Sequence, residues 1–192
     1  MPASGHVYAV EGWGLGEVWA DGTTLLAHDL PSPPRTRRAA PTHGRHDEDG
    51  DPEQAAPMGG ARPPLGTLPW ASPRDRATFV SNLCLRFACH LAGWRTGYED
   101  VELDVSWCTP FQSELLSALR SVPWGEVVTY GELAALAGRP GAARAAGSFC
   151  AGNRFSLVVP CHRVVAATSL GGYGDAGVDV KRRLLRLEGV TL

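Results

Sequence analysis

A cysteine followed directly by a histidine, at positions 161 and 162, is the feature of this 192-residue sequence most suited to chemistry. Cys161 and His162 follow Pro160 in residues 156–165 (SLVVPCHRVV), a segment otherwise rich in branched apolar residues. Proline has a fixed φ and no N–H group, so it interrupts the buried strand that the valines predict. We expect a bend there that holds the thiol and the imidazole in a fixed geometry. A thiolate is a good nucleophile, although a buried cysteine is usually an unreactive small apolar residue.

Glu188 is a further candidate because it occupies an unfavourable position in a helix. The preceding apolar residues recur at helical spacing, at Val180, Leu184 and Leu187, and Gly189 ends the pattern. A carboxylate in the last turn opposes the helix dipole, and such local conflicts are enriched at functional sites. Alternatively, Glu188 pairs with Arg183 or Arg186 at the surface, where an ion pair contributes little stability.

Two capping boxes precede the cysteine and predict helices. Residues 109–112 (TPFQ) and 129–132 (TYGE) both place a threonine three residues before a glutamine or glutamate. The second box starts a short helix through Ala137 that Gly138 terminates, and residues 141–152 can form another. Two short helices about a turn apart are typical of a helix-turn-helix, although structural hairpins share this pattern.

The second of these helices is slender. Glycine and alanine dominate it, and Arg144 is its only large residue before Phe149. A slim helix with one long cationic side chain can approach another surface closely, and DNA is a natural candidate, with Arg144 inserted into a groove or the base stack. The alternative is a helix that packs against the core through its small residues and leaves Arg144 solvated.

The rest of the chain predicts an α/β (α+β) fold. Residues 6–30 alternate polar and apolar positions between glycine-containing turns, which predicts two or three antiparallel strands. Residues 31–72 lack periodicity and are interpreted as a disordered insert. A helix is expected at 74–94 and a strand at 101–105. We therefore predict an N-terminal β-hairpin or sheet domain with a helix, residues 1–105, and a mostly helical C-terminal domain, residues 106–192, with the helix-turn-helix and active-site loop.

Composition and charge limit the function classes. No apolar run is long enough to span a bilayer, and the N-terminus lacks a signal-peptide pattern, so we expect a soluble cytoplasmic protein with no membrane partner. Five unevenly spaced cysteines without a Cys-x-x-Cys pair indicate a reducing compartment. Residues 109–192 hold nine Arg and Lys against six Asp and Glu, a net charge of +3, whereas residues 1–108 carry −5. This asymmetry weakly favours an anionic partner for the C-terminal part.

Together these residues resemble one family, the O6-alkylguanine-DNA alkyltransferases, also called methylated-DNA–protein-cysteine methyltransferases. The matching stretches are 109–112 (TPFQ), 122–130 (VPWGEVVTY), 143–147 (ARAAG), Asn153, 160–165 (PCHRVV), 171–173 (GGY) and 181–189. They cover nearly all of residues 109–192 in the family's order and spacing. The N-terminal half resembles the family only in outline.

The resemblance implies a DNA repair protein that flips O6-alkylguanine, mainly O6-methylguanine, out of duplex DNA. Cys161 would be the nucleophile and alkyl acceptor, His162 the general base acting through a water, and Glu188 the residue that orients the imidazole. The thioether product has no route back, so each molecule would act once, without a cofactor. The implied partner is duplex DNA containing O6-alkylguanine, bound by a monomer with no obligate protein partner, nucleoid-associated if the source is bacterial.

Further roles follow from the resemblance, position by position. Arg144 would fill the gap left by the flipped base, and Tyr130 would rotate the nucleotide and donate a proton towards the departing guanine. Asn153 would brace the turn between the recognition helix and the active-site strand. The carbonyls of Cys161 and Val164 would recognise the exocyclic amine. The remaining DNA-binding candidates are Ala143 and Gly147, and the pocket candidates are Pro160, Val164, Tyr173, Gly174 and Lys181.

Departures from the family and two other function classes complete the expectations. Arg154 stands where the family usually has proline, which gives a looser hinge or an added phosphate contact. Some members bind zinc through N-terminal cysteine and histidine, but this chain has His6 and His28 and no cysteine before Cys84, so we predict no metal site. Non-catalytic relatives have tryptophan in place of the reactive cysteine. The alternatives are a damage sensor with Cys161 merely buried, and a cysteine hydrolase, which needs another histidine because neighbours on one strand point to opposite sides.

Overall fold

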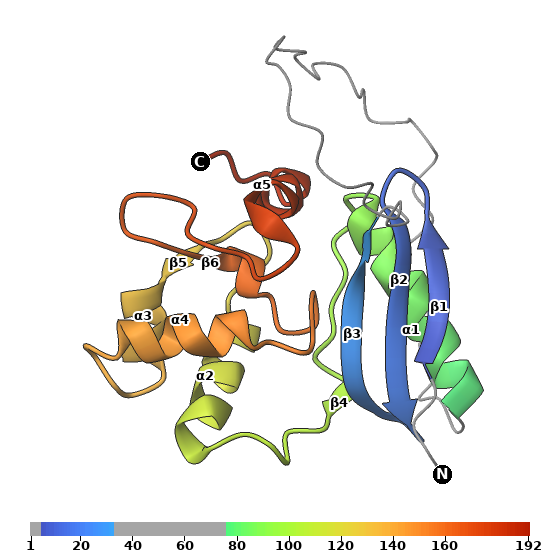
Figure 1. Cartoon of the computed structure of the whole chain (residues 1–192), viewed down its shortest axis with the longest axis horizontal. Coiled ribbons are helices and arrows are strands. Elements are labelled where there is room, and N and C mark those ends of the chain that lie inside the picture. Colours follow the sequence, from blue (N-terminus) through green and yellow to red (C-terminus); the bar gives the residue numbers. More distant parts are fainter. Residues whose placement is uncertain (1–4, 33–75) are drawn as a thin grey trace, which may run out of the picture. The chain divides into compact units, whose positions relative to one another are not determined.

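A small sheet begins the described part of the chain (Figure 1). The computed structural model describes residues 5–32 and 76–192. Strands β1 (Gly5–Val10), β2 (Gly14–Asp21) and β3 (Thr24–Ser32) pair antiparallel in that order. The sequence predicted two or three antiparallel strands here, and three are present. Strand β4 (Glu102–Leu103) adds parallel to β3. The insert predicted at 31–72 lies outside the described residues, apart from its first two, which end β3.

The strand expected at 101–105 is shorter than predicted because its flanking backbone groups bond elsewhere. The guanidinium of Arg120 donates to the carbonyl oxygens of Tyr98, Glu99 and Val101. On the other side, the carboxylate of Asp104 accepts from the N–H of Ser106, which turns the chain. Alternating polarity alone did not reveal these competing partners.

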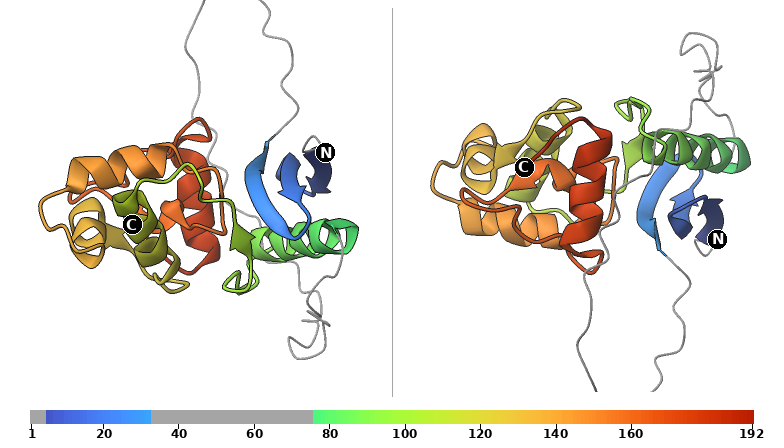
Figure 2. Two further views of the ribbon diagram at one scale, coloured as in Figure 1. Left: turned by 90° about the horizontal axis from the view of Figure 1, so that it is seen from below. Right: turned by 90° about the horizontal axis from the view of Figure 1, so that it is seen from above.

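Helix α1 (Arg76–Leu91) covers one face of the sheet, as the two views in Figure 2 show. Its buried residues recur every three or four positions, at Phe79, Val80, Leu83, Phe87 and Leu91. Strand β2 contributes Val18 and Ala20, two residues apart, to the same core. The helix predicted at 74–94 is therefore confirmed with slightly later and earlier ends.

Helices α2 (Pro110–Arg120), α3 (Tyr130–Leu136), α4 (Ala143–Ala151) and α5 (Gly177–Leu187) dominate the C-terminal part. Both predicted capping boxes are present, Thr109 with Gln112 and Thr129 with Glu132. Helix α4 begins two residues later than position 141, because Gly141 has a left-handed φ of 91°. Helix α3 packs on α4, and the intervening turn spans residues 137–142.

The segment that carries the cysteine is a tight turn. Cys161–Arg163 form a 3₁₀ turn, labelled η1, that runs into strand β6 (Val164–Val165), which pairs parallel with β5 (Val128–Thr129). The bend expected at Pro160 is present. Cys161 and His162 do not lie on one extended strand, so the opposite-faces argument against a hydrolase was based on a wrong local structure.

Strand β3 contacts the loop that leads to this turn. The backbone N–H of His28 donates to the carbonyl oxygen of Arg154, and Nδ1 of His28 lies 2.7 Å from the carbonyl oxygen of Ser156. His28 also stacks on Phe87 of α1, with ring centroids 3.8 Å apart. The N-terminal sheet thus bonds directly to the polypeptide before Cys161, and the predicted domain boundary after residue 105 stays a prediction.

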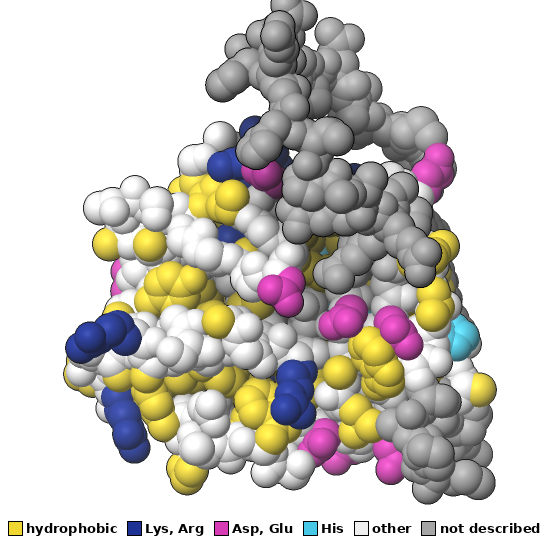
Figure 3. Space-filling view, viewed as in Figure 1, with side chains coloured by type: hydrophobic (Ala, Val, Ile, Leu, Met, Phe, Trp, Pro, Cys, Tyr) yellow, Lys and Arg dark blue, Asp and Glu magenta, His cyan; other side chains and the backbone are white. Residues whose placement is uncertain are grey.

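Two further features are the distribution of charged side chains on the surface and the length and polarity of the helices. On the face in Figure 3, basic side chains lie at the edge near α3 and α4, towards α5 and at the lower centre, and most acidic side chains lie closer to the strands. This distribution agrees in sign with the charge difference between the two halves of the sequence. Within residues 5–32 and 76–192, no helix has the length and apolar character needed to cross a membrane.

Candidate active site

Asn153 joins both ends of the loop that leads to the cysteine. Its Nδ2 donates to the carbonyl oxygen of Val159 at 2.8 Å and to Sγ of Cys161 at 3.0 Å, and its Oδ1 accepts from the N–H of Phe155 at 3.0 Å. Inside this loop, the buried Leu157 has a φ of 69°, a conformation that non-glycine residues rarely adopt. One side-chain amide therefore supports a strained loop and also contacts the sulfur.

His162 and Glu188 form a buried pair. Nε2 of His162 lies 2.8 Å from Oε1 of Glu188, and neither side chain is exposed. Glu188 is the C-cap of α5. Its charge is balanced by Arg163, whose Nε and Nη2 donate to the two carboxylate oxygens at 2.9 and 2.8 Å. The ion partner is thus Arg163 and not Arg183 or Arg186, which the sequence offered as the alternative.

The loop after α2 closes over this carboxylate. The N–H of Gly125 donates to Oε2 of Glu188 at 3.3 Å, and Nη1 of Arg163 donates to the carbonyl oxygen of Val122 at 2.7 Å. Gly125 has a φ of 82°, and a Cβ there would lie 3.1 Å from the backbone oxygen of Glu188. Glycine at this position lets the loop reach the carboxylate without strain.

The protonation states of this pair follow from burial and hydrogen bonds. Burial lowers the pKa of His162 to about 4, although Glu188 partly offsets it. Burial also opposes ionisation of Glu188, but hydrogen bonds led by that from His162 outweigh it and hold the pKa of the carboxyl well below its usual range. Near neutral pH, His162 is therefore uncharged and carries its proton on Nε2. Its Nδ1 is buried and has no hydrogen-bond partner among the described residues, so it is free to accept a proton.

Cys161 is buried beside these groups, and its thiol is not pre-ionised. Burial raises the pKa of Cys161, while the Asn153 amide and the Lys181 ammonium act in the opposite direction. Reaction as a thiolate thus needs a base. The ring of Tyr173 stands edge-on to that of His162, with the two ring centroids 6.5 Å apart, and the buried hydroxyl of Tyr173 acts on the Cys161 thiol in the direction that lowers its pKa.

Lys181 organises the segment that follows the cysteine. Its Nζ donates to the carbonyl oxygens of Val164 and Leu170, both at 2.5 Å, and of Gly172 at 3.2 Å. The lysine is fully buried, and burial lowers its pKa. Three backbone oxygens on one ammonium fix the course of residues 171–177 (GGYGDAG), the glycine-rich loop, relative to Val164. Gly174, the last pocket candidate, is exposed with a φ of 46°.

Tyr130, the first residue of α3, lies between α4 and the glycine-rich loop. A Cβ on Gly147 would lie 3.9 Å from its ring, and one on Gly171 would lie 3.2 Å from its hydroxyl. Burial raises the pKa of Tyr130. Arg144 is exposed on α4 and Ala143 is half-buried, so the structure brings Tyr130 and Gly147 together but leaves Arg144 at the surface.

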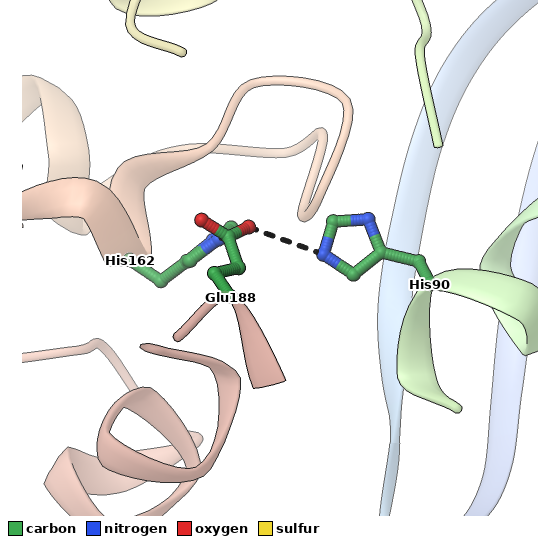
Figure 4. A group of neighbouring side chains, drawn as sticks. All are labelled: His90, His162 and Glu188. Atoms are coloured by element: carbon green, nitrogen blue, oxygen red, sulfur yellow. Dashed lines mark hydrogen bonds and ion pairs between the residues drawn. The ribbon is translucent and has the colours of Figure 1, made fainter. Parts of the chain in front are cut away.

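Residues that the sequence interpretation did not assign complete the site. Arg163 directly follows His162, and this position next to the candidate base was the only local signal for it in the sequence. The structure shows that Arg163 is buried. His90, in the last turn of α1, lies 3.4 Å from Oε1 of Glu188 through its Nε2 (Figure 4). It continues the apolar face of that helix, three residues after Phe87. His90, His162 and Glu188 could offer ligand atoms to a metal ion, and the predicted lack of a metal stays a prediction.

The C-terminal part of the chain is similar in sequence to known proteins. A family model described as 6-O-methylguanine DNA methyltransferase, DNA binding domain, matches residues 110–190. A methylated-DNA–protein-cysteine methyltransferase of Mycolicibacterium paratuberculosis is 43% identical over 118 residues, which cover 61% of this chain and 67% of that protein. The chain belongs to this methyltransferase family. The protein of the same name from Salmonella typhimurium is 54% identical over 85 residues, covering 44% of this chain and 49% of that relative.

The methyltransferase fold extends beyond the matched sequence. The crystal structure of Mycobacterium tuberculosis OGT in complex with DNA covers 96% of this chain and 92% of that one, at 28% identity and a TM-score of 0.65. It supports the mixed α+β fold with an N-terminal sheet and C-terminal helices. The sequence match nevertheless spans about half the length of the Salmonella relative.

Proposed function

We propose that the protein repairs DNA by moving the alkyl group of O6-alkylguanine, mainly O6-methylguanine, onto Cys161. The observation that carries the proposal is the arrangement around His162, which follows the buried Cys161, donates through Nε2 to Glu188 at 2.8 Å and has no hydrogen-bond partner at Nδ1 among the described residues. Membership of the methyltransferase family agrees with this chemistry.

In the proposed reaction the thiol of Cys161 loses its proton through a water to Nδ1 of His162. Glu188, kept ionised by Arg163, stabilises the imidazolium that forms. The thiolate attacks the alkyl carbon, a sulfur–carbon bond forms and the bond from that carbon to O6 breaks. Tyr130 supplies a proton towards the guanine as it leaves. The thioether formed on Cys161 is not hydrolysed in water near neutral pH, so each protein molecule reacts once.

The pocket in this proposal is made by backbone carbonyls and the glycine-rich loop. The carbonyl oxygens of Cys161 and Val164 accept hydrogen bonds from the exocyclic amine of guanine. Lys181 already donates to Val164, but a carbonyl oxygen has two lone pairs and keeps one for the base. Tyr173 and Gly174 wall the pocket, and Pro160 starts the turn that presents the carbonyl of Cys161.

Duplex DNA is the proposed partner, contacted by α4 in a helix-turn-helix with α3. Support comes from the slender surface of α4 at Ala143 and Gly147, the exposed Arg144, and the positive net charge of residues 109–192. The related M. tuberculosis OGT is named as a complex with DNA. All of the proposed reacting groups come from one chain, so the proposed reaction needs no second subunit, and we propose a monomer without an obligate protein partner.

The test is the intact mass of the protein after incubation with duplex oligonucleotide containing O6-methylguanine. We expect a gain of one methyl group per chain, located on Cys161, and repair that stops at one equivalent. Cys150→Ser, which keeps Cys161, should react equally, and Cys161→Ser should not gain mass. An unchanged mass with retained binding to the damaged duplex would identify a damage sensor, and turnover beyond one equivalent would exclude the single-use mechanism.

A further inference from the structure

His90 connects helix α1 to the carboxylate that His162 uses. It is fully buried, and its Nε2 faces the same oxygen of Glu188 that His162 bonds (Figure 4). At 3.4 Å this contact lacks hydrogen-bond geometry, and Nε2 has no other partner among the described residues. A buried polar atom without a bond is costly, and an apolar residue would serve packing alone better. His90 therefore needs an explanation beyond filling the core.

The tautomer of His90 follows from its second neighbour. The hydroxyl of Tyr98 lies 3.3 Å from Nδ1 of His90 and 3.4 Å from the carbonyl oxygen of Arg86, and it has one proton to give. If that proton went to Arg86, Nδ1 would carry the hydrogen and the Nε2 lone pair would face an ionised carboxylate, which is repulsive. If Tyr98 donates to Nδ1, the Nε2–H points at Glu188. Electrostatics selects the second arrangement.

A metal ion does not suit the same group of side chains. Two histidines and a carboxylate are a donor set that zinc accepts. However, the guanidinium of Arg163 already donates to both oxygens of Glu188 and neutralises its charge. A divalent cation would lie directly beside that guanidinium in a buried site. The charge of Arg163 therefore favours a neutral N–H donor at the position of His90.

We propose that His90 is a positioning residue for alkyl transfer, with its Nε2–H directed at Glu188 and its Nδ1 held by Tyr98. This inference rests on the proposed function. The donor limits rotation of the carboxylate and lowers its basicity, so the Nε2 proton stays on His162 when that ring also takes the proton of Cys161. Helix α1 thereby contributes to the reaction, although it lies outside the matched residues 110–190.

The test compares full-length variants in single-turnover methyl transfer from duplex oligonucleotide, with the pH dependence recorded. His90→Phe keeps a buried ring and removes the N–H directed at the carboxylate, and we expect transfer to slow about tenfold, the effect of losing one polar contact to a buried charge. The pH at which the rate of Cys161 alkylation by iodoacetamide reaches half of its maximum should rise. His90→Gln places an amide N–H near the position of Nε2 and should stay within about threefold of the parent rate.

Two controls separate positioning from packing. Phe87→Leu disturbs the same face of α1 without touching Glu188, so it should lower thermal stability and leave the pH profile unchanged. Tyr98→Phe should slow transfer, and combining it with His90→Phe should add little further loss, because both changes break the same series of contacts from Tyr98 through His90 to Glu188. Equal losses in His90→Gln and His90→Phe, or an unchanged rate and profile in His90→Phe, would overturn the proposal.

A measurement on the parent protein does not depend on the folding of any variant. The ¹⁵N chemical shifts of the His90 ring distinguish a proton on Nε2 from one on Nδ1, and we expect Nε2–H. A ring protonated on Nδ1 would overturn the inference. If the parent protein transferred no methyl group at all, the proposed function would fail, whereas a parent that reacts beside an unaffected His90→Phe would reject only the role of His90.

Discussion

Glu188 shows how one residue can conflict with its helix and still be stable. Its position at the end of α5 opposes the helix dipole, which costs up to about 1 kcal/mol at a typical exposed site. Its side chain turns into the protein and accepts from His162, Arg163 and Gly125. Charge-assisted hydrogen bonds of this kind are stronger than neutral ones, so they outweigh the dipole term. The local conflict is resolved by partners far away in sequence.

Replacing Glu188 by glutamine tests this account. Glu188→Gln removes the charge that balances the buried Arg163, so we expect the free energy of unfolding to fall by about 3 kcal/mol. Methyl transfer should slow by at least about tenfold because His162 loses its ionised partner. The pKa of Cys161 should rise further, measured from the rate of alkylation by iodoacetamide against pH. Asp179→Asn, which breaks an exposed pair with Arg182, should change none of these quantities.

An unchanged thiol profile in folded Glu188→Gln would remove Glu188 from the reacting site. Such a result would leave Cys161 and His162 as a pair whose geometry depends on the η1 turn alone. Loss of stability without any change in rate would mean that the carboxylate serves only as the counter-ion of Arg163.

The site residues that sequence reasoning found are those with a local or motif signal. Cys161, His162 and Asn153 lie within nine positions of one another, and Glu188 violates a helix rule that can be seen without a structure. His90 gave no comparable signal, because its contact with Glu188 joins positions 90 and 188 through the packing of α1. Burial raises the pKa of the Cys161 thiol, which the motif alone does not reveal. Burial is a property of the whole fold and cannot be derived from the motif.

At the scale of elements, α4 is a helix whose small residues allow α3 to pack closely against it. Gly147 lies against the ring of Tyr130, and Ala146 is fully buried, while Arg144 on the same helix is exposed. The sequence left two interpretations open, a helix packed on the core and a helix presented to another surface. The structure shows a helix packed through Ala146 with Arg144 exposed, and contact of the exposed face with another surface stays a prediction.

Arg144→Ala distinguishes a DNA role from a structural one. If Arg144 occupies the space of the extruded base, repair of duplex substrate should slow by about tenfold or more, since unstacking costs a few kcal/mol. Attack on free O6-methylguanine base should be unaffected, because a free base needs no flipping. Both rates are measured in single turnover, with Arg182→Ala on α5 as a control for lost charge.

Equal losses on duplex and free base would assign Arg144 to the fold or the pocket. An unchanged duplex rate would remove it from base extrusion altogether. Only a selective loss on duplex agrees with the proposed contact.

Element boundaries were predictable where a cap or a glycine marks them. The capping boxes at Thr109 and Thr129 start α2 and α3, and Gly138, with a φ of 76°, follows α3 as expected. The 3₁₀ turn at Cys161 was not predictable beyond a bend, because proline only excludes a continuous strand. The strand at 101–105 shrank since Arg120 takes carbonyl oxygens beside it.

At the scale of the whole molecule, three buried histidines link separate parts of the fold. His28 on β3 stacks on Phe87 of α1, His90 on α1 faces the carboxylate of Glu188, and His162 on η1 bonds that carboxylate. Burial lowers the pKa of all three, to about 4 for His28 and for His162. The packing that joins the N-terminal sheet to the active-site turn therefore requires uncharged imidazoles.

This requirement predicts that acid weakens the fold before most carboxylates titrate. Between the ordinary histidine pKa of about 6.5 and the folded value, the unfolded chain binds more protons, so the free energy of unfolding falls as the pH falls. His28 and His162 should each remove about 2 kcal/mol between pH 7.5 and pH 5.0. Glu188, whose pKa is lowered, begins to lose its contribution only when the pH falls below about 4.5, the ordinary pKa of its carboxyl group, which is outside this window. Urea unfolding at the two pH values and constant ionic strength measures the difference, and His28→Gln should reduce it by about 2 kcal/mol whatever its own effect on stability. An unfolding free energy that is the same at both pH values would show that these histidines are not held uncharged, and the pathway from β3 through α1 to His162 would lose its electrostatic basis.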